Sequence, residues 1–336
     1  MRQRRIQALL VAALVVLGVI AAIVGSQRGS HDRQTQVRTP PPPRAAQQPV
    51  HLSSTVVGQL SQPEQDAAVA QAGPASTILL GGLTAADTSR ADVIVLHGAR
   101  EARHDTLPTA VHDAAAVRLG RAVYLFGGGT NLGTTSDQIV RVSLSGRPPA
   151  QVDKLPRPLS DIAAATVGSS AFIVGGFDGA KAYDTIIAWR PGHRARVVGH
   201  LPHPLRYAAV ASLGRNLFIA GGSTPQGASH DVFSFDTVAR KLTLAARLPR
   251  PTTHAAAANF GCCVYVIGGR QEQLGTPTRR IFAIRPGRRH LLAAGRLPVA
   301  LSDLGAVAQR RRILAIGGRT RSSGTVATVV ELRPRR

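Results

Sequence analysis

The sequence is short of lysine, acidic residues and recognisable catalytic motifs. Only three lysines, Lys154, Lys181 and Lys241, stand among 41 basic residues, so arginine supplies almost all of the positive charge. No phosphate-binding loop, Gly-x-Ser-x-Gly elbow or His-Glu-x-x-His motif occurs, which excludes the enzyme classes that those motifs mark. The sequence therefore favours a binding protein over an enzyme and leaves other kinds of catalysis open.

The excess of arginine has two interpretations. A formal net charge of +23 and a sequence pI of about 11.7 are typical of proteins that bind polyanions. A biased nucleotide composition of the genome would equally produce many arginines and alanines, without selection for a ligand. We expect no nucleic acid partner, and attachment to cell-wall polyanions stays open.

Cysteine is also scarce, because Cys262 and Cys263 are the only two and they are neighbours. Two adjacent thiols cannot staple a domain of this size. Outside the cytoplasm they can form a strained vicinal disulfide or pair between chains. Local stiffening of a turn, or no role, is favoured over redox chemistry.

An apolar run of twenty residues, Ile6–Gly25, follows a basic tail of residues 1–5. The run is long enough to cross a bilayer and exceeds the apolar region of about 7 to 15 residues of a cleaved signal peptide. We therefore expect a single-pass signal anchor in the cytoplasmic membrane, with cleavage as the alternative. The polar, proline-rich residues 26–50 are predicted to form a stalk. Residues 51–336 are then expected on the extracytoplasmic side.

The remaining chain repeats itself. A Gly-Gly pair ends a short apolar run six times, and the first glycines are Gly81, Gly127, Gly175, Gly221, Gly268 and Gly317. The successive spacings are 46, 48, 46, 47 and 49 residues. Periods of this length indicate propellers or solenoids.

Each repeat carries signals for four strands. A Leu-Pro pair precedes the glycines by twenty residues in five repeats, and a strand rich in small residues lies between the two landmarks. An alternating strand and a fourth strand follow the glycines. Six units of four strands predict an all-β, six-bladed propeller.

These repeats resemble the Kelch repeat of the galactose oxidase-like propellers, over residues 51–336. The resemblance implies the fold and little about function, since Kelch propellers serve as enzymes, sugar binders and protein adaptors. The aromatic residues that usually follow the glycines are mostly missing, and only Tyr183 and Trp189 match them. The copper site of galactose oxidase also needs a Cys-Tyr cross-link, and no cysteine lies where that link would form. No Arg, Glu and His group can be assigned to the chemistry of Kelch-type sialic acid epimerases.

The two ends of the repeat region predict how the ring closes. The last unit stops after its third strand, and the segment Ser54–Leu60 before the first full unit is typical of a fourth strand. We therefore expect this N-terminal strand to complete the last blade, which removes two exposed sheet edges.

One position in the repeat is polar in every unit. Counting fourteen residues back from each Gly-Gly pair, with a shift of one in the first unit, gives Asp66, Asp113, Asp161, Tyr207, His254 and Asp303. Because first strands line the channel of a propeller, these side chains are predicted to ring one channel mouth. They have two interpretations: caps of local backbone amides, or a shared site for a hydroxylated or cationic ligand, a metal ion included.

The loops after the glycines are basic in the last two units. They contain Arg270, Arg279 and Arg280, then Arg319 and Arg321. This asymmetry is a candidate surface for an anionic partner.

Taken together, the sequence predicts a membrane-anchored binding or scaffold protein without an assigned cofactor. Its propeller is expected to present one loop face to a protein or glycan of the envelope. The alternative is a carbohydrate-active or metal-binding enzyme that uses the aspartate-rich channel mouth.

Overall fold

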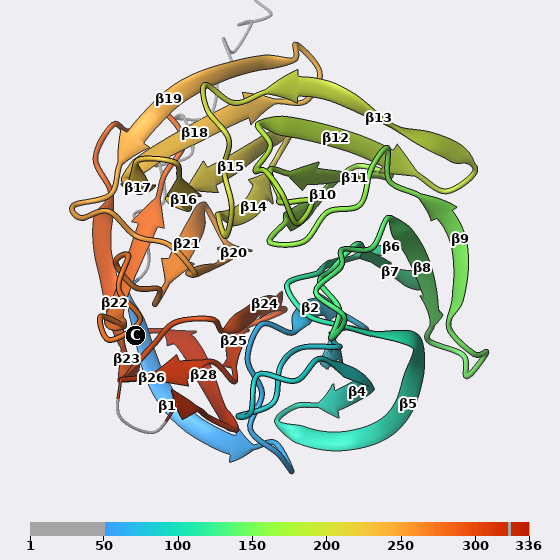
Figure 1. Ribbon diagram of the computed structural model, residues 1–336. Coiled ribbons are helices and arrows are strands. Elements are labelled where there is room, and N and C mark those ends of the chain that lie inside the picture. Colours follow the sequence, from blue (N-terminus) through green and yellow to red (C-terminus); the bar gives the residue numbers. More distant parts are fainter. Residues whose placement is uncertain (1–50, 322–323, 336) are drawn as a thin grey trace, which may run out of the picture. The chain divides into compact units, whose positions relative to one another are not determined.

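The structure is a computed structural model that describes residues 51–321 and 324–335. Six four-stranded antiparallel sheets surround a central channel, as Figure 1 shows. The predicted basic tail, signal anchor and stalk, residues 1–5, 6–25 and 26–50, lie outside the described residues. In the part of the chain that is described, no helix is long and apolar enough to span a membrane.

The first three blades follow one another along the chain. Blade 1 contains β2 (Ala68–Gln71), β3 (Ser76–Leu80), β4 (Arg90–His97) and β5 (Arg100–Val111); blade 2 contains β6 (Ala115–Leu119), β7 (Ala122–Phe126), β8 (Gln138–Ser143) and β9 (Ala150–Lys154); blade 3 contains β10 (Ala163–Val167), β11 (Ser170–Val174), β12 (Thr185–Arg190) and β13 (His193–His200).

The next three blades complete the ring. Blade 4 contains β14 (Ala209–Leu213), β15 (Asn216–Ala220), β18 (Asp231–Asp236) and β19 (Lys241–Arg247); blade 5 contains β20 (Ala256–Phe260), β21 (Cys263–Ile267), β22 (Thr278–Ile284) and β23 (Leu292–Leu301); blade 6 contains β24 (Gly305–Gln309), β25 (Arg312–Ile316), β28 (Thr328–Pro334) and β1 (Leu52–Gln59). Two small hairpins project from the loops of blades 4 and 6: β16 (Ser223–Thr224) with β17 (Gly227–Ala228), and β26 (Arg319–Thr320) with β27 (Gly324–Thr325).

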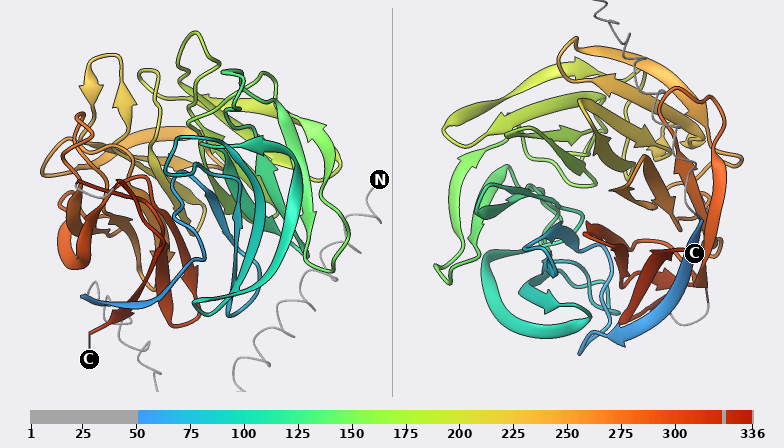
Figure 2. Two further views of the ribbon diagram at one scale, coloured as in Figure 1. Left: turned by 60° about the horizontal axis from the view of Figure 1, so that its bottom comes forward. Right: turned by 180° about the vertical axis from the view of Figure 1, so that it is seen from behind.

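Strand β1 closes the ring as the sequence predicts. It pairs antiparallel with β28, so the first and last described strands share blade 6, and the blue and red ribbons lie side by side in Figures 1 and 2. This pairing covers the outer edge of β28, which would otherwise present unpaired backbone groups. The predicted six blades, their four strands and this closing strand are confirmed.

The hydrophobic core lies between neighbouring blades. In β3, Ile78 and Leu80 pack against blade 2, whereas Leu79 packs against blade 6. Successive strand residues point to opposite faces, and both faces of the sheet are covered. The second strand of each blade is therefore a continuous apolar run rather than an alternating one.

The Gly-Gly landmark has a steric cause. The first glycine of each pair has a positive φ, +67° at Gly175. A Cβ atom there would overlap the carbonyl oxygen of Leu205, which begins the approach to the next blade. Only glycine permits this conformation together with so close an approach.

Candidate functional site

The six predicted mouth residues are joined by their own backbone. The N–H of each donates to the carbonyl oxygen of the corresponding residue in the preceding blade: Asp113 to Asp66, Asp161 to Asp113, Tyr207 to Asp161, His254 to Tyr207, Asp303 to His254 and Asp66 to Asp303. The donor–acceptor distances are 2.9–3.2 Å, and the chain of hydrogen bonds is closed. We name these six residues the mouth ring.

All six residues of the mouth ring adopt left-handed backbone conformations. Their φ values lie between +51° and +58°. Aspartate and histidine tolerate this region better than most residues, whereas an aromatic residue such as Tyr207 is unusual there. The strain of about 1–2 kcal/mol for each residue is offset by the inter-blade hydrogen bonds. The repeated conformation turns every side chain of the ring in the same sense.

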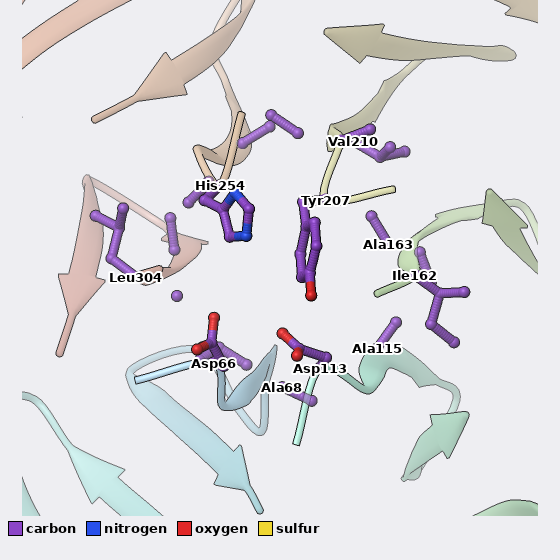
Figure 3. A pocket seen from close by; sticks show the side chains of 18 of the residues that line it. Asp66, Ala68, Asp113, Ala115, Ile162, Ala163, Tyr207, Val210, His254 and Leu304 are labelled. Atoms are coloured by element: carbon purple, nitrogen blue, oxygen red, sulfur yellow. The ribbon is translucent and has the colours of Figure 1, made fainter. Parts of the chain in front are cut away.

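These side chains line one cavity of about 170 Å³ at the end of the channel, together with the small residues that open each first strand. Figure 3 shows Asp66, Asp113, Tyr207 and His254 pointing into it. The sequence predicted the position but not that the six side chains would meet in a single cavity, because that depends on the width of the channel.

Two acidic side chains of the ring form a carboxyl pair. Asp66 and Asp113 hydrogen-bond to one another, and burial raises the pKa of both well above the usual range. The nearby carboxylates add to the rise, Asp303 in both cases and Asp161 in the case of Asp113. The raised pKa values favour retention of a proton by the pair, and a pair that holds a proton can donate as well as accept hydrogen bonds.

The third carboxylate, Asp161, is bound by an arginine. The Nε of Arg206 lies 2.5 Å from Oδ2 of Asp161, and Asp161 is buried. Arg206 also packs over the ring of Phe177, 4.2 Å from its centroid, and its Nη2 donates to the hydroxyl of Tyr207 over 3.3 Å. Burial raises the pKa of Tyr207, so the phenol stays protonated.

His254 has a single tautomer. Its Nε2 accepts a hydrogen bond from Nη2 of Arg270 over 3.0 Å, so the ring proton is on Nδ1, which faces the hydroxyl of Thr253 at 3.0 Å. Burial, with Arg270 and Arg206 nearby, lowers the pKa of His254 to about 2. The neutral imidazole stacks on Tyr207 with 3.7 Å between ring centroids.

Asp303 completes the ring between two further partners. It accepts a hydrogen bond from the hydroxyl of Ser302, and its Oδ2 lies 3.9 Å from Nε of Arg270. Burial raises the pKa of Asp303, although Ser302 and Arg270 oppose the rise. Asp161 and Asp303 are thus bound by side chains, which does not match the interpretation of these residues as caps of local backbone amides.

Several residues that shape the site were missed in the sequence. Arg206, Thr253 and Ser302 contact the mouth ring, and each directly precedes a ring residue. This position is polar in all six repeats, with Gln65, His112 and Ser160 in the other three. The polar residue before each ring position can therefore be found in the sequence from the repeat spacing alone.

The arginines of the basic loops predicted from the sequence lie partly beside the mouth ring and partly at a second cavity. Arg270 borders the mouth ring, and Arg319 approaches it through Gln65, with Nη1 3.4 Å from Oε1. Arg280 and Arg321 line a second cavity, and Nε of Arg279 donates to the carbonyl of Leu297 over 2.7 Å. Binding of a partner by these residues stays a prediction.

Cys262 lies in the turn between β20 and β21, and Cys263 is the first residue of β21. Their Sγ atoms are 3.0 Å apart, in a contact between thiols rather than at the length of about 2.05 Å of a disulfide. Burial raises the pKa of Cys263 to about 12, which keeps that thiol protonated. The vicinal disulfide stays a prediction for the oxidised protein.

A metal ion would need several ligands close together. Among residues 51–321 and 324–335, no three His, Cys, Asp or Glu side chains lie close enough to share one ion. The acids of the mouth ring instead bind to one another, to arginine or to serine.

The comparisons with known proteins identify the fold. The solved structure of YjhT is similar, with a TM-score of 0.71 and 14% sequence identity, over 83% of this chain and 99% of YjhT. At this identity the likeness establishes architecture alone. No family model matches the sequence, and no curated protein is found as a relative. The protein is an all-β, six-bladed propeller with four-stranded antiparallel blades.

Proposed function

We propose that this protein is a non-enzymatic binding module whose mouth ring takes a neutral, hydroxyl-rich ligand such as one sugar unit of an envelope glycan. The observation that carries the proposal is the mouth ring itself. Six polar side chains are fixed by one closed chain of backbone hydrogen bonds and line one cavity. Such a site is preorganised, so binding costs little conformational entropy.

The charge state of the site favours a neutral ligand. The raised pKa values of the carboxyl pair favour its protonated form, the lowered pKa of His254 keeps the imidazole neutral, and Asp161 is paired with Arg206. Protonated carboxyl and phenol groups offer both donors and acceptors, which hydroxyl groups of a sugar satisfy. The cavity of about 170 Å³ is smaller than the roughly 300–1,000 Å³ of pockets for drug-sized ligands, so it suits a single unit at the end of a longer molecule.

The arrangement gives little support to glycoside hydrolysis. That reaction uses two carboxyl groups about 5–9.5 Å apart, whereas Asp66 and Asp113 are close enough to hydrogen-bond. A general base must also reach its substrate. Both ring nitrogens of His254 are already engaged, and its pKa of about 2 makes it a weak base.

The alternative function is a carbohydrate-active enzyme that uses the same mouth. One observation favours it, because a buried carboxyl pair with raised pKa values is typical of acid–base sites. Prolonged incubation with each sugar that binds, followed by NMR of the sugar, distinguishes the two. An unchanged spectrum supports the binding module, and an epimer or another new product supports the enzyme.

The proposed setting follows from the sequence. The repeats support a degenerate Kelch propeller, and the run Ile6–Gly25 with the stalk of residues 26–50 supports tethering to the outer side of the cytoplasmic membrane. A tethered propeller can present its mouth to a protein or glycan of the envelope. No cofactor is part of this proposal.

The direct test is calorimetric titration of the full-length chain in a neutral detergent with glucose, galactose, N-acetylglucosamine and sialic acid. The variant Asp66→Asn/Asp113→Asn keeps the size of both side chains and removes both carboxyl groups. We expect it to weaken binding about tenfold or more, since lost hydrogen bonds are left unpaired. The matched control, Asp137→Asn/Asp184→Asn, makes the same two substitutions outside the cavity. Equal binding by both variants overturns the mouth as the site.

A further inference from the structure

A second cavity, of about 290 Å³, lies beside the mouth on the loops of the last three blades. Three segments that are far apart in sequence line it: the link between β19 and β20 around Arg250–Thr252, the approach to β22 around Thr276–Arg280, and Arg321 after β26. Arg270 lines it as well and is the one charged residue that it shares with the surroundings of the mouth ring.

Four arginines line this cavity: Arg250, Arg270, Arg280 and Arg321. Two of them are fixed by backbone carbonyls. Nε of Arg321 donates to the carbonyl of Gly275 over 2.7 Å, and Nη1 of Arg270 donates to the carbonyl of Glu272 over 2.6 Å. Carbonyl groups orient these side chains without neutralising their charge.

Within the described part of the chain, acidic side chains compensate little of this positive charge, because only Arg270 of the four arginines has an ion pair, with Asp303. No aspartate or glutamate lines the cavity there, and the nearby carboxylate of Glu272 lies against Gly227 instead. The side chain of Arg270 is only 10% exposed, and its Nε has no hydrogen-bond acceptor. The nearest acid to that Nε is Asp303 at 3.9 Å, a carboxyl group that already accepts from Ser302. Like charges at short range repel one another, and an anion in the cavity would remove that cost.

The hydroxyl group of Thr278 adds a further hydrogen-bond donor to the cavity. Oγ1 of Thr278 accepts from the N–H of Arg280 over 3.3 Å, which leaves the hydroxyl proton to donate. Arginine forks and hydroxyl donors around a small concave site match the oxygens of a phosphate group. We propose that this cavity is a binding site for a phosphate-bearing ligand, separate from the sugar site of the mouth ring.

The test uses the full-length chain in a neutral detergent at constant ionic strength set with chloride. Thermal shift and calorimetry are measured with inorganic phosphate, glycerol 3-phosphate and a short-chain phosphatidylglycerol below its micellar concentration. Acetate serves as the single-carboxylate comparison. We expect phosphate compounds to bind and acetate to bind at least tenfold more weakly, because it offers two acceptor oxygens rather than three or four. If only the lipid binds, the ligand is a membrane headgroup. If glycerol 3-phosphate binds as well, the ligand is a soluble or polymeric phosphate ester. Both outcomes support the proposal.

The variant Arg250→Gln/Arg280→Gln removes two exposed guanidinium groups without touching Arg270 or the mouth ring. We expect its Kd for phosphate to rise about tenfold or more, as charge-assisted hydrogen bonds are lost. The matched control is Arg121→Gln/Arg147→Gln, which removes two exposed arginines of blade 2 and the same net charge. Equal weakening in both variants, or no phosphate binding by the unaltered chain, overturns the proposal. The sugar titration of Arg250→Gln/Arg280→Gln is expected to be unchanged, so this site and the proposed mouth site fail independently.

Discussion

At one of the six blade junctions, the residue that accepts the inter-blade backbone hydrogen bond has a titratable side chain. This residue is Glu64. Its carbonyl oxygen accepts from the N–H of Gly318, the second glycine of blade 6, over 2.7 Å. The equivalent acceptors at the other junctions are Val111, Leu159, Leu205, Thr252 and Leu301. Glu64 is 2% exposed, its Oε1 has no hydrogen-bond partner, and its Oε2 lies 3.2 Å from Nε of Arg90. A titratable group therefore occupies a core position.

This carboxyl group makes stability depend on pH. Burial raises the pKa of Glu64 to about 8, against the opposing effect of the Arg90 guanidinium. Between pH 4.5 and 8 the folded state holds the proton while the unfolded state releases it, so the free energy of unfolding falls as pH rises. At about 1.4 kcal/mol for each pKa unit, the loss is on the order of 4 kcal/mol. We expect the Tm of the unaltered chain to fall from pH 5 to pH 8 relative to that of Glu64→Gln, measured by circular dichroism.

The matched control for this prediction is Glu331→Gln. Burial is the largest influence on the pKa of Glu331, but hydrogen bonds from Arg333 and Arg312 outweigh it and lower that pKa. Glu331 is thus ionised in both folded and unfolded states above pH 5.5 or so. Its replacement should lower Tm by nearly the same amount throughout pH 6–8. A Tm difference between the unaltered chain and Glu64→Gln that does not change with pH would contradict the assignment of Glu64.

Single functional residues could be predicted only where they occupy a fixed position in the repeat. The spacing from each Gly-Gly pair located all six positions of the mouth ring. It did not reveal that Asp66 hydrogen-bonds to Asp113 or that Arg206 pairs with Asp161, because those contacts join different blades. Glu64 was missed for a related reason: its burial follows from the closure of the ring and not from the residues around it in sequence.

At the scale of the blade, the turn at each Gly-Gly pair joins neighbouring sheets. Gly175 and Gly168 allow a matched test, since their φ values are +67° and +60°. A Cβ atom at Gly175 meets the carbonyl of Leu205, whereas a Cβ atom at Gly168 meets nothing within 4 Å. We expect Gly168→Ala to cost about 1–2 kcal/mol, the cost of the left-handed conformation alone. Gly175→Ala should cost more than about 3 kcal/mol, because overpacking is added to it.

Urea unfolding of the two alanine variants checks this prediction. The difference in free energy between them isolates the contact with the next blade, since the backbone cost is common to both. Equal losses in the two variants would mean that neighbouring blades shift apart freely. The Gly-Gly landmark would then mark a turn and no more.

Elements were predicted well wherever a strand is buried on both faces. The apolar runs before the glycines correspond to β3, β7, β11, β15, β21 and β25. The predicted closing strand Ser54–Leu60 differs from β1 by two residues at its start and by one at its end. The hairpins β16–β17 and β26–β27 were missed. Each of their strands has only two residues, which is too short for hydrophobic periodicity to give a signal.

At the scale of the whole molecule, the ring is held together where its two ends meet. Strand β1 forms seven residue pairs with β28, and Leu52 packs with Leu297 and Leu301 of blade 5. The hydroxyl of Ser54 donates to the carbonyl of Arg296 over 2.6 Å, which ties β1 to blade 5 as well. One strand thus stabilises two blades, and neither can be covered fully without it.

Two truncations test this closure. Removal of residues 2–50 leaves β1 in place and should preserve a single cooperative unfolding transition in urea. Removal of residues 2–60 deletes β1 and the buried Leu52 and Leu60, and exposes the edge of β28. We expect a lower midpoint and a smaller m value, because m scales with the surface exposed on unfolding and blade 6 would already be open. A synthetic peptide of residues 51–60 should restore the transition by adding back the strand. Indistinguishable transitions for the two truncations would show that the other inter-blade contacts, including the closed hydrogen bonds of the mouth ring, suffice to hold the propeller together.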